Sequence, residues 1–267
     1  MNILYIGDVM AETGMLVVER ILPDLRREKN IDFVVAQAEN VSNGKGLSVR
    51  DYERLQKAGV DAFTGGNHTP YQAELYELLE SSTAPVVGPA NMEECPGPGY
   101  KLVETSKGPI LVVSLLGSIV GKHADTPVEN PLKKIDEILA NVPRDSYNAS
   151  VVNFHGDFSS EKVVFGFYVD GRVSVAVGDH WHVPTADARL LPKGTAHMTD
   201  VGMCGVLDSS LGVKIESIIP RWRDGAQTKN ELATEGAIQF NALWVDVDEK
   251  TGLANCVEPI RIILDRI

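Results

Sequence analysis

The sequence has few cysteines and no long apolar run. Its three cysteines, Cys95, Cys204 and Cys256, show no paired spacing, so we expect no disulfide framework and a reducing compartment. No apolar run approaches the roughly 18 residues that a membrane-spanning helix needs. The first residues also lack the basic segment and cleavage pattern of a signal peptide. We therefore expect a cytoplasmic protein with no membrane partner.

Positive charge is also scarce, because 25 basic residues face 37 acidic ones and the formal net charge at pH 7 is −12. A surface of this sign repels the phosphate backbone of nucleic acids, so long DNA or RNA is not expected as a partner. A small anionic substrate remains compatible with this charge, because bound divalent cations can reverse its sign inside one pocket.

Apolar runs alternate with helical patterns along most of the chain. The runs that predict buried strands are "ILYIGD", "DFVVAQAEN", "DAFTGGNH", "GPILVVSLLG", "ASVVNFH" and "RVSVAVGDH". Between them, the spacing of apolar residues predicts helices at about 15–29, 48–58, 71–80, 130–140 and 160–168. This alternation predicts an α/β fold with a largely parallel sheet covered on both faces.

The C-terminal part follows a different pattern. Two apolar segments flank the turn "DEKTG", which predicts an antiparallel hairpin. No internal repeat, low-complexity tract or linker interrupts the chain. We therefore expect a single domain that spans residues 1–267.

Polar and ionisable side chains stand where five of the apolar runs end. These residues are Asp8, Glu39, Asn40, Asn67, His68, His155, His180 and His182. In open α/β sheets, ligands bind beyond the carboxyl ends of the strands. Helix capping explains a single Asp or Asn in such a place, but it does not explain five runs together. The sequence therefore predicts a ligand site at this edge of the sheet.

The residue types at these strand ends favour a metal site. Carboxylates, amide oxygens and imidazoles together suit iron, manganese or zinc. The absence of cysteine from the set argues against a structural thiolate zinc site. His180 and His182 are two residues apart, so on an extended segment their rings face the same side. Each ring could then bind one of two adjacent metal ions.

The order of short motifs resembles that of the YmdB-like branch of the calcineurin-like metallophosphoesterases. The matching segments are "IGDV", "AEN" followed by "GKG", "AGVD", "GNHT", "PAN", "SEK", "YVDGRVS", "HVPTAD", "LPKGTA" and "TDVGM". They run from Met1 to about Gly205, and their joint presence carries the resemblance. It implies a layered metallophosphoesterase-type sheet with flanking helices, with largely parallel strands plus the C-terminal antiparallel hairpin.

The resemblance also implies a dinuclear metal site, with iron or manganese favoured. The implied ligands are Asp8, Asn40 and His182 for the first metal, Asn67, His155 and His180 for the second, and Glu39 as the bridge. His68 resembles the family's catalytic imidazole and is not an implied ligand. The broader superfamily has Asp-x-His in its first motif, whereas this chain has Asp8-Val9-Met10, so Asn40 takes the place of that histidine.

The implied activity is hydrolysis of small phosphodiesters, foremost 2′,3′-cyclic nucleotides. A hydroxide that bridges the two metals would attack phosphorus, and His68 would protonate the leaving oxygen as a general acid. Two other functions stay open, a metal-dependent phosphomonoesterase and a metal-binding regulatory protein with little turnover. A homo-oligomer is compatible with each of the three.

Several positions near the expected site bear on the substrate. Ser118, Asp157 and Trp181 depart from the residues that close relatives carry there. Lys45, in "NGKG", fits either a phosphate contact or a solvated turn. Asp200 fits either a partner that orients a ligand histidine or a turn residue.

Overall fold

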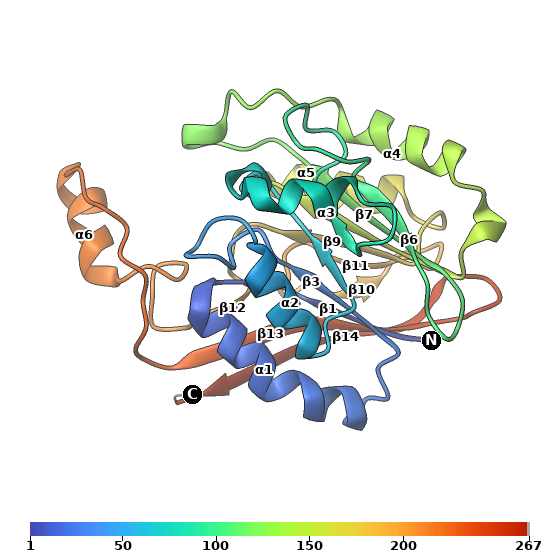
Figure 1. Cartoon of the computed structure of the whole chain (residues 1–267), viewed down its shortest axis with the longest axis horizontal. Coiled ribbons are helices and arrows are strands. Elements are labelled where there is room, and N and C mark those ends of the chain that lie inside the picture. The colour runs from blue at the N-terminus through green and yellow to red at the C-terminus, as the bar shows by residue number, and fades with distance from the viewer. Residues whose placement is uncertain (266–267) are drawn as a thin grey trace.

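The computed structural model describes residues 1–265 and contains two β-sheets, each built around parallel strands (Figure 1). The larger sheet comprises β1 (Asn2–Ile6), β2 (Asp8–Val9), β3 (Phe33–Gln37), β4 (Ala62–Thr64), β5 (Val86–Val87), β12 (Met203–Val206), β13 (Ile238–Val247) and β14 (Ala254–Leu264). The smaller sheet comprises β6 (Tyr100–Val103), β7 (Ile110–Leu116), β8 (Ala149–His155), β9 (Val175–Asp179), β10 (Arg189–Leu190) and β11 (Ala196–Met198).

Helices cover the outer faces of the sheets. The α-helices are α1 (Ala11–Glu28), α2 (Val49–Lys57), α3 (Tyr76–Glu80), α4 (Pro131–Asn141), α5 (Ser159–Tyr168) and α6 (Ile215–Asp224), and the 3-10 turns are Thr69–Tyr71, Ala73–Leu75, Gly121–His123 and Arg144–Ser146. Helices α1, α2 and α3 pack on the larger sheet, and α4 and α5 pack on the smaller one. None of the helices within residues 1–265 is both long and apolar enough to cross a membrane.

The strand order of the larger sheet is β2-β12-β13-β1-β3-β4-β5, with β14 paired to β13, and that of the smaller sheet is β10-β11-β9-β8-β7-β6. Strands β1, β3, β4 and β5 are parallel neighbours, as are β7, β8, β9 and β11. The expected C-terminal hairpin is the antiparallel pair β13 and β14. The predicted α/β class, with largely parallel strands and this hairpin, is confirmed.

The division into two sheets is not evident from the sequence. In β1, Leu4 and Ile6 belong to the core beneath α1 and α2, whereas Ile3 and Tyr5 belong to the core between the two sheets. A strand buried on both faces has a continuous apolar sequence whichever element covers it. The apolar run therefore correctly predicts that both faces of the strand are buried. It does not reveal that a second sheet packs on one of these faces.

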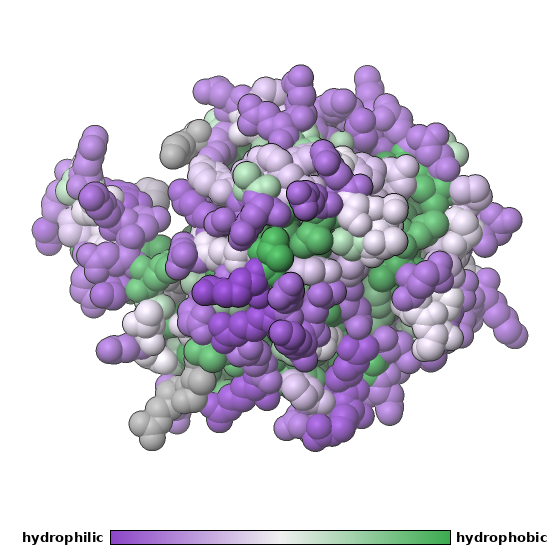
Figure 2. Space-filling model, in the orientation of Figure 1, coloured by the Kyte–Doolittle hydropathy of each residue, from purple (hydrophilic) through white to green (hydrophobic). Residues whose placement is uncertain are grey.

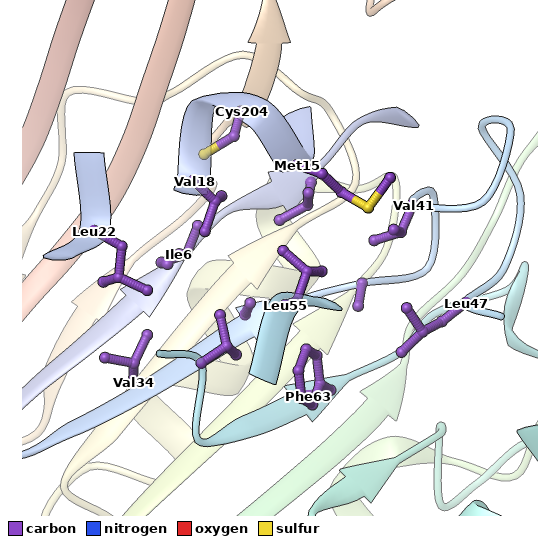
Figure 3. Packing of buried hydrophobic residues seen from close by; sticks show 14 of the residues in the cluster. Ile6, Met15, Val18, Leu22, Val34, Val41, Leu47, Leu55, Phe63 and Cys204 are labelled. Atoms are coloured by element: carbon purple, nitrogen blue, oxygen red, sulfur yellow. The ribbon is translucent and has the colours of Figure 1, made fainter. Parts of the chain in front are cut away.

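The core beneath α1 fixes the larger sheet and its strand ends. Met15, Val18 and Leu22 of α1 are at most 2% exposed and point toward the strands that carry Ile6 and Val34 (Figure 3). Their spacing of three and four residues places them on one face of the helix. Each such side chain contributes about 1.5–3 kcal/mol by leaving water.

One predicted helix is shorter than expected and another helix was not predicted. The expected helix over 71–80 is two 3-10 turns followed by the short α3, because Gln72 adopts φ −114° and ψ 88°, outside the helical region. Helix α6 has no buried residue and projects from the body as a separate, mostly hydrophilic lobe (Figures 1 and 2). Its apolar residues Ile215, Ile218, Ile219 and Trp222 do follow helical spacing, but none of them is buried against the core.

Candidate metal centre

The predicted site residues meet at the carboxyl ends of strands from both sheets. Asp8 follows β1, Glu39 and Asn40 follow β3, and Asn67 and His68 follow β4 in the larger sheet. His155 ends β8, and His180 and His182 follow β9 in the smaller sheet. Both sheets thus contribute side chains to one place. Within each sheet these side chains lie beyond the carboxyl ends of the strands, where ligands bind in open α/β sheets.

Side chains around Asn40 form one half of the cluster. The Asn40 Nδ2 lies 3.0 Å from Asp8 Oδ1, 3.0 Å from Glu39 Oε1 and 3.3 Å from His182 Nε2. His182 Nε2 also lies 3.4 Å from Asp8 Oδ2. Asp8, Asn40 and His182, the three residues expected to share one metal, are therefore mutual neighbours.

Glu39 connects this half to the second. Its Oε1 lies 3.4 Å from His155 Nε2, and that same nitrogen lies 2.9 Å from Asn67 Oδ1. The His155 and His180 ring centroids are 4.5 Å apart. Ligand atoms of Glu39, His155 and His180 all lie within 4.8 Å of one another, a grouping able to hold a metal ion.

The hydrogen bonds of His155 support a cation at this place. His155 Nδ1 lies 2.5 Å from the buried Asp179 carboxylate, so this nitrogen carries the proton. Burial holds the pKa of His155 well below its ordinary value, and the ring is neutral. Nε2 therefore turns a lone pair toward the oxygens of Glu39 and Asn67. A metal ion between these three donors would convert mutual repulsion into coordination.

The buried carboxylate of Asp8 gives an independent indication that a cation can bind here. Its Oδ2 is buried and has no hydrogen-bond donor among the described residues. Burial alone would raise the pKa of Asp8, but His182, His155 and Asn40 together lower it below the ordinary value. Burial alone would likewise lower the pKa of His182, and the Asp8 carboxylate instead raises it to about 9. A proton on His182 thus compensates the buried negative charge of Asp8. A metal ion would compensate the same charge, so the residues fit a metal site.

Glu39 is the second buried carboxylate. Burial and the nearby charge of Asp8 raise its pKa well above the ordinary value. Its Oε2 accepts the backbone N–H of His68 at 2.9 Å, and its Oε1 faces His155. The two oxygens therefore point to different neighbours, which is compatible with a bridging carboxylate.

His68 lies at the edge of the cluster and is partly exposed. Its Nδ1 is 2.7 Å from Asn40 Oδ1, and its ring lies edge-on to Tyr71 and His123 at centroid distances of 5.4 and 5.5 Å. Burial lowers the pKa of His68 to about 4, so the free ring is neutral at pH 7. An anionic group in contact with the ring would raise this pKa again, because a negative charge favours the imidazolium form.

The geometric reason expected for the His180 and His182 pair is wrong. The segment after β9 is not extended: His180 has φ 106° and His182 has φ 62°. The backbone turns between the two rings, so His180 Nε2 lies 3.3 Å from Asp157 while His182 Nε2 reaches Asp8. Both rings arrive at the cluster because of a tight turn, and positive φ at non-glycine residues is uncommon outside such sites.

The group that orients His155 was not predicted from the sequence. The Asp179 carboxylate is fully buried, accepts the Tyr5 hydroxyl at 2.6 Å and is contacted by Asn153. Burial raises its pKa to about 6. Asp179 is the last residue of β9, directly before His180. It is therefore also a polar residue at the end of an apolar strand, the criterion by which the other site residues were recognised.

Asp200 supports the backbone of the histidine turn. Its carboxylate accepts the Trp181 N–H at 2.9 Å, the Gly202 N–H at 2.9 Å and the buried Lys162 ammonium at 2.8 Å. Lys162 in turn lies 4.1 Å from the Trp181 ring centroid. These contacts hold Trp181, the residue between His180 and His182.

The donors open into a cleft of about 680 Å³. Glu39, Asn40, His68, His180 and His182 line it. The lining also includes Gly44 and Lys45 and residues of α6 and the following loop, Ile218, Arg221, Trp222 and Asn230. A cleft of this volume can hold a small organic ligand. Helix α6, absent from the sequence prediction, is thus part of the site.

Comparison with known proteins identifies similar chains of nearly equal length. The sequence profile of the family described as "YmdB-like protein" matches residues 4–260. A 2′,3′-cyclic-nucleotide 2′-phosphodiesterase of Bacillus subtilis (strain 168) is 36% identical over 263 residues, which cover 98% of this chain and 97% of that protein.

Solved structures agree with the sequence comparison. A crystal structure described as a novel phosphatase from Mycoplasma pneumoniae superposes with a TM-score of 0.91 at 33% identity, covering 100% of this chain and 94% of that one. A hypothetical protein from Thermus thermophilus superposes with a TM-score of 0.88 at 37% identity, covering 98% and 99% of the respective chains.

Proposed function

Since this chain belongs to the YmdB-like family, we propose that it is a metal-dependent phosphodiesterase that hydrolyses 2′,3′-cyclic nucleotides. The observation that carries the proposal is the convergence of carboxylate, amide and imidazole donors from both sheets in one cluster that opens into a cleft. The Bacillus subtilis relative bears the name of this activity, which supports the substrate class.

The proposed ligand set comprises Asp8, Asn40 and His182 for one metal, Asn67, His155 and His180 for the other, and Glu39 between them. Iron and manganese are the metals that this thiolate-free set of oxygen and nitrogen donors favours. When bound, such a pair of ions would orient the phosphate and lower the pKa of a water toward neutrality. The protein supplies the donors and, through Asp179, the orientation of His155.

His68 is the proposed general acid for the leaving oxygen of the sugar. Its ring lines the cleft, and its Nδ1 is held by the Asn40 amide. As a general acid His68 would be the imidazolium form, in which both ring nitrogens carry a proton. Nδ1–H would donate to the Asn40 oxygen, which has a second lone pair available for a metal, and Nε2–H would be free to face the substrate.

The shape and charge of the protein favour a small substrate. The cleft volume lies within the range of sites that hold mononucleotide-sized ligands. The net charge of −12 disfavours a polyanion that must lie along the surface. We therefore propose a small phosphodiester, and not long RNA, as the substrate.

A phosphomonoesterase is the second candidate, because the structural relative from Mycoplasma pneumoniae is described as a phosphatase. The same donors would serve a monoester, since both reactions attack phosphorus. The test supplies manganese-loaded protein with 2′,3′-cyclic AMP, 3′,5′-cyclic AMP, an aryl phosphodiester and an aryl phosphomonoester. Preferred turnover of the 2′,3′-cyclic substrate supports the proposal, and turnover of the monoester alone supports the second candidate. Metal binding without any turnover would instead indicate a regulatory protein.

The role of His68 is tested by replacing it with alanine. His68→Ala should keep its metals but lose about 10²–10⁴-fold in kcat for a substrate with a poor leaving group, because a general acid acts in the transition state. His182→Ala is the matched control, and it should lose metal as well as activity. Wild-type kcat in a metal-loaded His68→Ala protein would remove His68 from the proposed mechanism.

A further inference from the structure

The loop that carries Lys45 is held beside the cleft by backbone turns and hydrogen bonds. Asn43, Gly44 and Gly46 have φ values of 54°, 78° and 73°, the left-handed region that favours glycine. The Lys45 N–H donates to Ser42 O at 3.1 Å, and the Lys45 carbonyl accepts the Gln72 side chain at 3.1 Å. The backbone of Lys45 is therefore fixed from both sides, and this fixes the starting point of its side chain.

The Lys45 ammonium lies at the His68 side of the cleft. Its Nζ is 4.9 Å from the Tyr71 ring centroid, and the Tyr71 ring lies edge-on to His68 at 5.4 Å. An ammonium over an aromatic face is attracted by the ring without losing its hydrogen-bonding protons to a carboxylate. Lys45 and His68 thus flank one tyrosine and both line the cleft.

Lys45 differs from Arg221, the other lysine or arginine side chain in the described lining of the cleft. The Arg221 guanidinium donates to Thr228 O at 2.8 Å and to Asn230 Oδ1 at 2.9 Å, so its hydrogen bonds hold the loop after α6. Lys45 is exposed, and the ion pairs found within residues 1–265 include no carboxylate partner for it. The chain has a net charge of −12, yet this ammonium stands beside the cluster of proposed metal donors without a carboxylate partner. It can therefore bind an anionic group in the cleft.

We propose that Lys45 binds the phosphate of the substrate, as a residue that positions the anion between the metal centre and His68. This inference rests on the proposed function, because it assumes that the cleft takes a phosphate ester. Lys45 would act by charge and hydrogen bonding to a phosphate oxygen already present in the ground state. Its removal should therefore weaken binding more than it slows the chemical step.

The test compares Lys45→Met, Lys45→Arg and the control Lys57→Met in manganese-loaded full-length protein. Lys57 is an exposed lysine at the end of α2 and does not line the cleft, so its replacement makes the same change in net charge. Lys45→Met should raise KM for 2′,3′-cyclic AMP about tenfold or more, with kcat within about twofold of wild type. Lys45→Arg should restore most of the affinity, and Lys57→Met should leave KM unchanged.

Calorimetric titration with inorganic phosphate tests Lys45 without requiring turnover. Lys45→Met should raise the Kd for phosphate about tenfold, and the dependence of Kd on salt concentration should become weaker. An unchanged KM and Kd in Lys45→Met, or equal losses in Lys57→Met, would overturn the inference. A wild-type protein that binds phosphate through Lys45 yet hydrolyses no ester would refute the proposed function while supporting the phosphate site.

Discussion

At the scale of single residues, the sequence pointed to the polar residues that cluster in the structure more readily than to the groups that orient them. Asp8, Glu39 and His155 are recognisable because each is a polar residue at the end of an apolar run. Tyr5 lies inside such a run, and only the fold shows that its hydroxyl points at Asp179. A contact of this kind depends on how two sheets face each other, and the sequence pattern of one strand does not contain it.

Asp179→Asn is the substitution that tests this orienting role. Asparagine retains the shape but removes the negative charge that holds the proton on His155 Nδ1. Loss of such an outer partner typically lowers metal affinity about 10–100-fold. Titration of the metal-free protein with Mn²⁺ should show this loss, whereas Asp136→Asn, which alters a surface pair with Arg172, should bind Mn²⁺ as the wild type does. Equal affinities in all three proteins would contradict the role of Asp179.

At the scale of elements, the helices and strands packed on the cores were mostly predictable, whereas the projecting helix α6 and the irregular segments were not. Helix α1 and the β13–β14 hairpin follow from apolar spacing because each packs one face on a core. The turn that presents His180 and His182 depends on positive φ values, which no apolar pattern encodes. The reason first inferred for the histidine pair was therefore wrong, although both rings do lie in the cluster.

The start of α2 is hydrogen-bonded to the loop that carries Lys45. Asp51, in the first turn, accepts the Ser42 hydroxyl at 2.6 Å and lies 2.9 Å from the Arg50 guanidinium. Burial alone would raise the pKa of Asp51, but hydrogen bonds from Ser42 and Arg50 lower it below the ordinary value. A carboxyl whose pKa is lower in the folded state stabilises the fold above the unfolded pKa of about 3.9. This stabilisation is lost as the pH falls through the folded pKa.

Asp51→Asn should therefore destabilise the protein in a pH-dependent way. At pH 7 the free energy of unfolding should fall by about 1.5–3 kcal/mol, the range for a hydrogen bond to a charged group. The difference from wild type should shrink as the pH is lowered below about 4. Urea unfolding at several pH values measures this directly, with Asp24→Asn at an exposed ion pair as the control. A difference that stays constant with pH would show that the Asp51 charge is not responsible.

At the scale of the whole molecule, the candidate site belongs to neither sheet alone. Asp8, Glu39 and Asn67 come from the larger sheet, and His155 and His182 come from the smaller one. Bound metal would therefore connect the two sheets at the edge where α6 projects. A ligand that binds only the folded state stabilises it, by about 2.7 kcal/mol at one hundred times its Kd. The sequence predicted this edge, but not that two sheets share it.

The most direct measurement of the central claim is the number of metal ions retained per chain. Purified protein is equilibrated with Mn²⁺, freed of unbound metal and subjected to elemental analysis beside His182→Ala. We expect about two ions per wild-type chain, as in two-metal phosphoesterases, and fewer in His182→Ala, which lacks one ligand. A wild-type chain that retains no metal, or a His182→Ala chain that retains as much as wild type, would contradict the proposed centre.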